Sequence, residues 1–247
     1  MNESLKHKRA LVTGGSRGIG AAIVQRLARE GADVTFTYTS SPDQANKTAH
    51  RAQSFGVRAT AIQADSTDAD AVVAAVERTV AELGGIDILV NNAGVLAIAP
   101  IDDLTLADFD RTFAVNVRAV FVATQAAVKH MGEGGRIINI GSTNAERMPF
   151  AGGSAYAMSK SALQGLVKGL ARDLGPRGIT INNVQPGPIA TDMNPPEGEF
   201  AEVLTKLMAI PRFGSVEDVA GMVAYLAGSE AGFITGASLM IDGGFSA

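Results

Sequence analysis

The sequence predicts an α/β protein built on one doubly wound parallel sheet of about seven strands, with helices on both faces. Short apolar runs alternate with longer amphipathic segments along the whole chain. The apolar runs show little polar alternation, which is typical of strands that are covered on both faces. Because parallel strands need a crossover connection, a helix between successive strands fits the same architecture.

The predicted strands are the apolar runs, at residues 10–13, 34–38, 57–63, 86–91, 136–140, 179–184 and 238–242. The predicted helices lie between them, at residues 18–30, 43–55, 68–83, 105–131, 154–174 and 216–228. Capping patterns mark three helix starts, at Thr67, Thr105 and Ser215, each followed by Asp in the first turn. No linker, charge block or repeat divides the chain, so residues 1–247 are predicted to form a single domain.

Composition excludes several function classes. With 46% hydrophobic and 19% charged residues the chain is expected to be globular, and its net charge of -4 gives no reason to expect a nucleic-acid partner. The absence of cysteine excludes disulfides and thiolate catalysis, and the scattered His7, His50 and His130 predict no metal site. The N-terminus is polar and no apolar run reaches transmembrane length, so we expect no membrane partner and a cytoplasmic location.

A glycine-rich turn follows the first strand and opens the first helix. Residues 13–20 read Thr-Gly-Gly-Ser-Arg-Gly-Ile-Gly. Glycines at 14, 18 and 20 would allow a tight turn, close approach of the backbone to a pyrophosphate, and tight packing of helix on strand. The spacing differs from Gly-x-Gly-x-x-Gly, but its place after the first strand favours a dinucleotide site over a simple strand break.

The end of the second strand bears on the choice of dinucleotide. An acid there usually binds the ribose 2′-hydroxyl of NAD, and residues 38–41 read Tyr-Thr-Ser-Ser, without an acid. Hydroxyls and the nearby Arg17 can hold a 2′-phosphate instead. The sequence therefore favours NADP(H), with NAD(H) possible; the alternative is that Arg17 is a solvated surface residue and Ser40 a turn former.

Polar residues follow the third and fourth strands. Asp65 is placed to accept a hydrogen bond from an adenine amino group, or equally to cap the following helix. Residues 91–94 read Asn-Asn-Ala-Gly at the carboxyl end of the fourth strand, the edge where ligands of such sheets bind. These two amides are expected either to bridge neighbouring strands or to touch a cofactor.

Tyr156 and Lys160 form the candidate catalytic pair. Residues four apart on a helix project from one face, so a phenol and an ammonium meet. The positive charge is expected to lower the pKa of Tyr156, and Ser142 is placed to hydrogen-bond the same oxygen that Tyr156 protonates. Such a pair alone is more often a surface pair. Asn116, among apolar residues of a helix, either satisfies a backbone group and kinks the helix or has a functional role.

Together these motifs resemble the classical short-chain dehydrogenase/reductase family, a Rossmann-type fold, over residues 8–246. The run Pro-Gly-Pro-Ile-Ala-Thr at 186–191 adds to the resemblance. The resemblance implies that Tyr156 is the general acid and base, that Ser142 polarises the carbonyl, that Lys160 lowers the tyrosine pKa and holds the nicotinamide ribose, and that Asn116 anchors a water that passes protons to Lys160. It implies cofactor contacts from Gly14, Ser16, Arg17, Gly18, Ile19, Gly20, Tyr38, Thr39, Ser40, Asp65, Ser66, Asn92, Ala93, Gly94, Tyr156, Lys160, Pro186, Gly187, Ile189 and Thr191.

The implied reaction is reduction of a ketone or aldehyde by hydride transfer, and its reverse. The segment near 190–210 is expected to be a substrate lid, whose apolar residues suit a small hydrophobic carbonyl or alcohol substrate. The alternative is an amphipathic helix that packs its leucine side on the body of the protein. The first alternative is a 3-oxoacyl-carrier-protein reductase, although residues 129–135 are less basic than in that subfamily. The second is a regulator that binds a cyclic dinucleotide, which residues 147–149 and 185–188 suggest.

Small residues recur every four positions in the helix predicted at 154–174. They are Ala157, Ser161, Gly165 and Gly169, which would admit a second helix closely. The alternative is close packing on the subunit's own sheet. Members of the family commonly pair this helix across a dimer axis, so we expect a homotetramer built as a dimer of dimers.

Overall fold

A parallel sheet lies at the centre of the computed structural model, which describes residues 4–247; residues 1–3 of the predicted domain lie outside this range. Its strands are β1 (Arg9–Val12), β2 (Asp33–Tyr38), β3 (Ala59–Gln63), β4 (Ile88–Asn91), β5 (Arg136–Ile140), β6 (Thr180–Pro186) and β7 (Ser238–Ile241). Their order is β3-β2-β1-β4-β5-β6-β7, and every neighbouring pair is parallel. The predicted doubly wound sheet is confirmed, with strand ends shifted by one or two residues.

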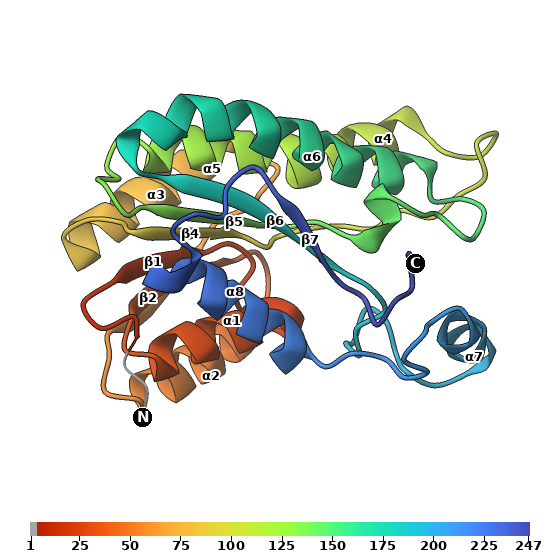
Figure 1. The fold of residues 1–247 in the computed structure, drawn as a ribbon, viewed down its shortest axis with the longest axis horizontal. Helices are drawn as coiled ribbons and strands as arrows, with labels where there is room; N and C mark the ends of the chain where they lie inside the picture. Colours follow the sequence, from red (N-terminus) through yellow and green to blue (C-terminus); the bar gives the residue numbers. More distant parts are fainter. Residues whose placement is uncertain (1–3) are drawn as a thin grey trace.

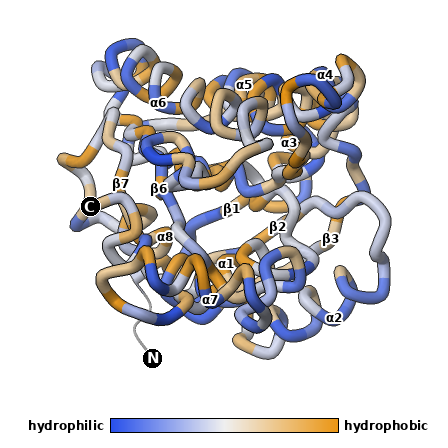
Figure 2. The backbone as a smooth tube through the Cα atoms, turned by 90° about the vertical axis from the view of Figure 1, so that its right-hand side faces the viewer, coloured by the Kyte–Doolittle hydropathy of each residue, from blue (hydrophilic) through white to orange (hydrophobic). Residues whose placement is uncertain are grey.

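Helices cover both faces of the sheet, as predicted. They are α1 (Gly18–Arg29), α2 (Pro42–Gln53), α3 (Ala69–Leu83), α4 (Leu106–Phe113), α5 (Ala119–Ala127), α6 (Ser154–Leu174), α7 (Glu199–Lys206) and α8 (Val216–Ala227). α3, α4, α5 and α6 lie above the sheet in Figure 1, and α1, α2 and α8 lie below it; Figure 2 shows the same layers from the side. No helix in the described range is both long and apolar enough to cross a membrane.

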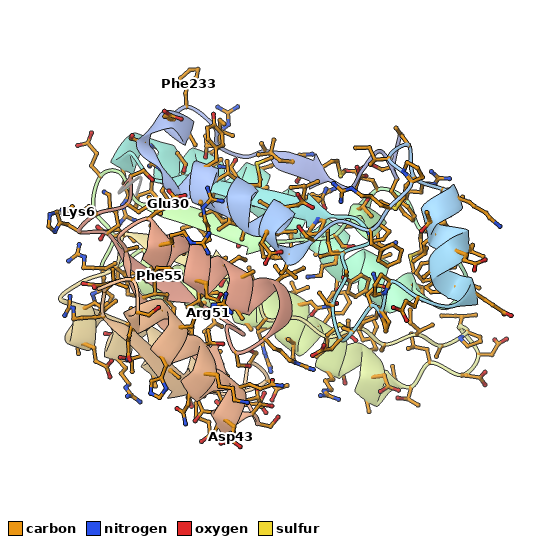
Figure 3. All side chains as sticks on the ribbon, turned by 90° about the horizontal axis from the view of Figure 1, so that it is seen from below. Lys6, Glu30, Asp43, Arg51, Phe55 and Phe233 are labelled. Carbon is orange, nitrogen blue, oxygen red and sulfur yellow. The ribbon has the colours of Figure 1, made fainter. Side chains whose placement is uncertain are left out.

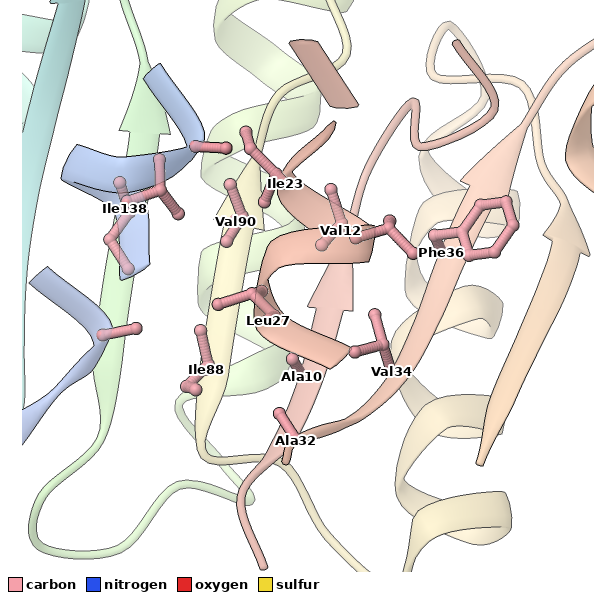
Figure 4. Packing of buried hydrophobic residues seen from close by; sticks show 14 of the residues in the cluster. Ala10, Val12, Ile23, Leu27, Ala32, Val34, Phe36, Ile88, Val90 and Ile138 are labelled. Atoms are coloured by element: carbon pink, nitrogen blue, oxygen red, sulfur yellow. The ribbon is translucent and has the colours of Figure 1, made fainter. Parts of the chain in front are cut away.

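Alternating side chains of each strand fill two separate cores. Val12 points to the α1 face, where Ile23 and Leu27, one turn apart on α1, pack against it and Val90 (Figure 4). Its neighbour Leu11 belongs to the opposite core, under α3, α5 and α6. Burying each such side chain contributes about 1.5–3 kcal/mol, so the strands are stabilised from both sides, as their unbroken apolar pattern indicates.

The predicted helix at 105–131 is wrong in one respect, because it is interrupted. α4 ends at Phe113, a π-helical turn spans Ala114–Arg118, and α5 continues from Ala119. Asn116 lies in the wide turn, where its side chain bonds to backbone outside the helix. π-helical turns are often found at functional sites.

Two of the three predicted caps form, and one is wrong. Thr105 accepts the N–H of Asp108, and Ser215 forms a full capping box with Asp218 at the start of α8. Thr67 does not cap α3; Asp68 does, because its carboxylate accepts the N–H groups of Asp70 and Ala71. A carboxylate one residue later in the chain reaches these N–H groups better than the Thr67 hydroxyl.

A line of buried amides crosses the sheet. Asn91 donates to Asn139 at 2.9 Å, and Asn139 donates to Asn183 at 3.1 Å. Asn183 then donates to the Ser238 hydroxyl at 3.1 Å. These residues are register partners on β4, β5, β6 and β7. The line fixes strand register next to the carboxyl ends, because a slip of one residue would turn each amide to the other face.

Candidate active site

The site lies where the strand order reverses. β1 has β2 on one side and β4 on the other, so the loops after β1 and β4 diverge and leave a crevice at the carboxyl edge. A cavity of about 1270 Å³ opens there. All of the predicted cofactor-binding residues line it, as do Ser142, Tyr156 and Lys160; Asn116 lies behind its wall.

The glycine turn forms one wall of the cavity. Gly14 and Gly18 have positive φ angles of 67° and 55°, which side chains rarely adopt. A Cβ on Gly20 would lie 2.1 Å from the Gly14 carbonyl oxygen, so a larger residue would displace the turn. No side chain within residues 4–247 caps α1, so its first N–H groups remain available at the cavity. Such N–H groups suit an anion.

Asn92 fastens the glycine turn to the neighbouring strand. Its side-chain nitrogen donates to the carbonyl oxygens of Thr13 and Gly14, each at 2.9 Å. Of the two roles considered for the paired amides, the geometry therefore favours bridging the strands. Asp65 accepts the N–H of Thr67 at 2.8 Å and lines the cavity; it does not cap α3.

Tyr156, Lys160 and Ser142 meet at the floor of the cavity. Tyr156 and Lys160 lie one turn apart on α6, and Ser142 follows β5. Lys160 is 4% exposed, and its ammonium donates to the Ile140 carbonyl oxygen at 2.8 Å and lies 5.7 Å from the centroid of the Tyr156 ring. The sequence prediction that these groups share one surface therefore agrees with the geometry.

The predicted lowering of the Tyr156 pKa is wrong for this structure. Burial raises the pKa of Tyr156, because water no longer stabilises the phenolate, and a hydrogen bond with Ser142 opposes this only in part. Burial also lowers the pKa of Lys160 to about 8. The Lys160 ammonium donates to the Ile140 carbonyl oxygen, and burial of the phenol outweighs the effect of this charge on the Tyr156 pKa. Tyr156 consequently keeps its proton at neutral pH, as a general acid requires.

Asn116 holds the wall behind Lys160. Its oxygen accepts the N–H of Val95 at 2.9 Å, and its nitrogen donates to the carbonyl oxygen of Val95 and to the Ser159 hydroxyl, each at 3.0 Å. A Cβ on Gly94 would lie 3.5 Å from both the Asn116 oxygen and the Lys160 nitrogen. The two side chains thus converge on the Gly94 backbone.

The outer part of the cavity is apolar. Leu96 and Ile98 come from the loop after β4, and Met193 and Phe200 come from the lid segment. Phe150 meets Phe200 edge to face, with ring centroids 5.5 Å apart. These side chains surround the space in front of Ser142 and Tyr156 with hydrocarbon.

Asn144 and Phe245 are among the cavity residues that were not predicted. Asn144 lines the cavity and exchanges hydrogen bonds with Ser142. Its place two residues after the predicted serine was the available signal, since Asn, Ser and Asp bond to nearby backbone in such turns. Phe245 closes the floor from the far end of the chain, packed on Leu204 and Met208. No local pattern marks that contact.

Comparisons with known proteins agree with this geometry. A family model described as enoyl-(acyl carrier protein) reductase matches residues 14–246. The cyclic-di-GMP-binding biofilm dispersal mediator protein of Escherichia coli is 54% identical, over 97% of this chain and 98% of that protein. A short-chain dehydrogenase/reductase of Serratia marcescens has a TM-score of 0.97 at 62% identity, covering 98% of this chain and 99% of its own. A short-chain dehydrogenase of Burkholderia cenocepacia, solved with NADP, has a TM-score of 0.97 at 56% identity, with the same two coverages.

Proposed function

Since the chain belongs to the short-chain dehydrogenase/reductase family of NAD(P)-dependent oxidoreductases, we propose that it reduces a small hydrophobic ketone or aldehyde with NADPH and catalyses the reverse oxidation. The observation that carries this proposal is the meeting of Tyr156, Lys160 and Ser142 on one cavity with the glycine turn. The cavity, at about 1270 Å³, exceeds the usual 300–1,000 Å³ of a single-ligand pocket, which suits a cofactor and a substrate together.

The residues present fit a nicotinamide dinucleotide. The open N-terminus of α1 suits a pyrophosphate, and a Cβ on Gly18 would project into space bounded only by the Thr191 methyl at 3.8 Å. Arg17, Thr39 and Ser40 offer a cation and hydroxyls, which favours the 2′-phosphate of NADP(H) over NAD(H). The Burkholderia neighbour, solved with NADP, supports this preference. By the resemblance to the family, the nicotinamide end of the cofactor would contact Ile189, Thr191 and Lys160.

NADPH, when bound, supplies the hydride that adds to the carbonyl carbon. Tyr156 transfers its proton to the carbonyl oxygen, and Ser142 donates a hydrogen bond to the same oxygen as negative charge develops there. Proton transfer leaves a phenolate on Tyr156. The Lys160 ammonium, 5.7 Å from the centroid of the Tyr156 ring, stabilises that anion, since a nearby opposite charge favours the charged form.

Replacing one tyrosine tests this role. Tyr156→Phe removes the proton donor, so turnover of a ketone should fall by about 10²–10⁴-fold while NADPH binding persists. Tyr225→Phe, on the opposite side of the sheet in α8, is the matched control and should keep full turnover. Undiminished NADPH oxidation by Tyr156→Phe would refute the proposal.

A 3-oxoacyl-carrier-protein reductase is the second candidate. The matching family model is described as an enoyl-(acyl carrier protein) reductase, a name that shares the carrier protein with this candidate but refers to reduction of a carbon–carbon double bond and not of a ketone. Residues 129–135 do not discriminate, because they precede β5 and lie at the amino edge of the sheet, away from the cavity. The low basicity of this segment therefore does not bear on the binding of a carrier protein at the cavity. Initial rates on an acyl thioester and on a simple ketone would separate the two candidates.

A cyclic-dinucleotide regulator is the third candidate, because the Escherichia coli relative carries that description. Arg147, one of the residues considered for it, already donates to the Phe245 carbonyl oxygen at 2.6 Å and stacks on that ring. Calorimetry with cyclic-di-GMP, compared with NADPH oxidation on a ketone panel, distinguishes a regulator from an enzyme.

We also propose that the protein assembles as a homotetramer. A Cβ on Gly165 or Gly169 would meet no atom of residues 4–247 within 4 Å, apart from α6 itself. These two glycines therefore do not serve packing on the chain's own sheet, whereas Ser161, from the same repeat, donates to the Ala145 carbonyl oxygen of this chain. Phe233, fully exposed shortly before β7, projects from another surface (Figure 3). Both positions suit contacts between copies.

A further inference from the structure

The hydroxyl of Ser142 is engaged by a neighbouring side chain. Its oxygen accepts the Asn144 N–H at 3.1 Å, and its proton is directed at the Asn144 side-chain oxygen, 3.2 Å away. A hydroxyl has only one proton to donate. The same hydroxyl also lies within hydrogen-bond reach of Tyr156. Ser142 can therefore donate to Tyr156 or to a substrate carbonyl only after its proton leaves Asn144.

The Asn144 amide is held in this orientation. Its nitrogen donates to the Arg147 carbonyl oxygen and to the Met148 sulfur, each at 3.2 Å. Both N–H bonds of the amide are thus used, and its oxygen must face Ser142. Asn144 also lines the cavity, so this oxygen lies beside the place where the substrate reacts.

Turning Ser142 toward the substrate leaves the Asn144 oxygen without its side-chain donor. An acceptor that loses its partner in a partly buried site destabilises the complex unless another donor replaces it. A hydroxyl or ammonium on the carbon next to the carbonyl is such a donor. The carbonyl oxygen of such a substrate and the donor on its adjacent carbon are separated by about the length of a hydrogen bond. The Ser142 and Asn144 side-chain oxygens are 3.2 Å apart, so each can bond one of these two substrate atoms.

We propose that Asn144 determines specificity, selecting ketones that carry a hydrogen-bond donor on the adjacent carbon: α-hydroxy ketones and protonated α-amino ketones. This rests on the carbonyl reductase proposed above and names its substrate class. The apolar side chains of the outer cavity accept the remainder of the substrate.

Two ketones of equal size test the proposal. Kinetics with NADPH are measured on 2-hydroxyacetophenone and on propiophenone, in which a methyl replaces the hydroxyl. The ratio of kcat/KM for the two ketones should fall by about tenfold in Asn144→Leu relative to the unmodified protein. Intrinsic reactivity of the ketones cancels in this comparison. Asn46→Leu, at an exposed asparagine of α2 that is not among the residues lining the cavity, is the control and should leave the ratio unchanged.

NADPH binding checks that each variant is folded, and Asn144→Ala replaces Asn144→Leu if the larger side chain disturbs the loop. If the unmodified protein reduces propiophenone and the ratio of kcat/KM is the same in the Asn144 variant, the inference about Asn144 is overturned. The proposed reductase activity then still stands. Failure of the unmodified protein to reduce either ketone while it binds NADPH overturns both.

Discussion

Burial acts on Tyr156 and Lys160 in opposite directions and favours the neutral form of each. The pKa of the phenol rises and that of the ammonium falls to about 8. The proton needed for reduction is therefore held on Tyr156 over the whole neutral range. The charge on Lys160 is the part of the pair that responds to pH.

The activity of the proposed reductase should follow that charge. Below pH 8 Lys160 is mainly an ammonium and can stabilise the tyrosyl anion; above pH 8 it becomes neutral and the stabilisation is lost. The value of kcat/KM for NADPH, which reports groups of the free enzyme, should be level below about pH 8 and decline above it. A decline only near 10.5, the ordinary lysine value, would contradict this. Lys160→Met should be weakly active without the inflection.

Gln185 offers a stability test beside the site. It is fully buried in β6, and no group of the described chain hydrogen-bonds either end of its amide. Gln185→Met keeps the volume and removes both polar groups, so the free energy of unfolding should rise by about 1–3 kcal/mol. Urea denaturation measures it. Asn183→Leu is the contrasting variant, because it leaves Asn139 and Ser238 without a hydrogen-bond partner and should lower the free energy of unfolding. If Gln185→Met lowers it as well, the Gln185 amide has hydrogen-bond partners in the folded protein.

At the scale of elements, the cap of α8 has a measurable value. Ser215 and Asp218 satisfy each other's backbone N–H groups. Ser215→Ala should lower the free energy of unfolding by about 1 kcal/mol. Ser41→Ala is the matched control, because Ser41 begins α2 but its side chain makes no capping bond to residues 4–247. Equal losses from the two variants would assign the effect to something other than the cap.

Most elements could be predicted because their signals are local. Apolar runs located every strand, and amphipathic segments located the helices that cover the sheet. The exception is that α4 and α5 were predicted as one continuous helix, without the break between them. That break depends on bonds from Asn116 to Val95 and Ser159, which are distant in sequence. The segment that contains α7 was expected to be a lid, with an amphipathic helix packing its leucine side on the body as the alternative. The structure has such a helix, in which Leu204 is buried against Phe245.

For the whole molecule, the sheet explains why the cavity residues could be predicted together. Carboxyl ends of parallel strands meet at one edge, so motifs after β1, β4, β5 and β6 had to converge. The direction of the Tyr156 pKa could not be predicted, because it depends on how deeply the phenol is buried. Asn144 and Phe245 join the site through the loop after β5 and the C-terminal segment, whose paths no pattern specifies.

The open face of α6 gives a test of assembly. Gly165→Trp would place a bulky side chain where the proposed partner helix lies, so the tetramer should dissociate into smaller species in sedimentation velocity. Gly132→Trp, at a loop position where a Cβ also meets no atom of residues 4–247 within 4 Å, should leave assembly unchanged. Identical sedimentation of the two variants would exclude this face as a contact between copies.

The wide turn at Ala114–Arg118 determines where the chain tolerates changes of length. A π-helical turn holds one residue more than an α-helical turn, so loss of a single residue there would let the two flanking helices merge into one regular rod. All positions on one side of the deletion would then rotate by roughly 100° about the axis. Either Asn116 would leave its backbone partner or α5 would leave its core. Homologous chains should therefore vary in length in surface loops, such as residues 192–198, and keep a constant count through this turn.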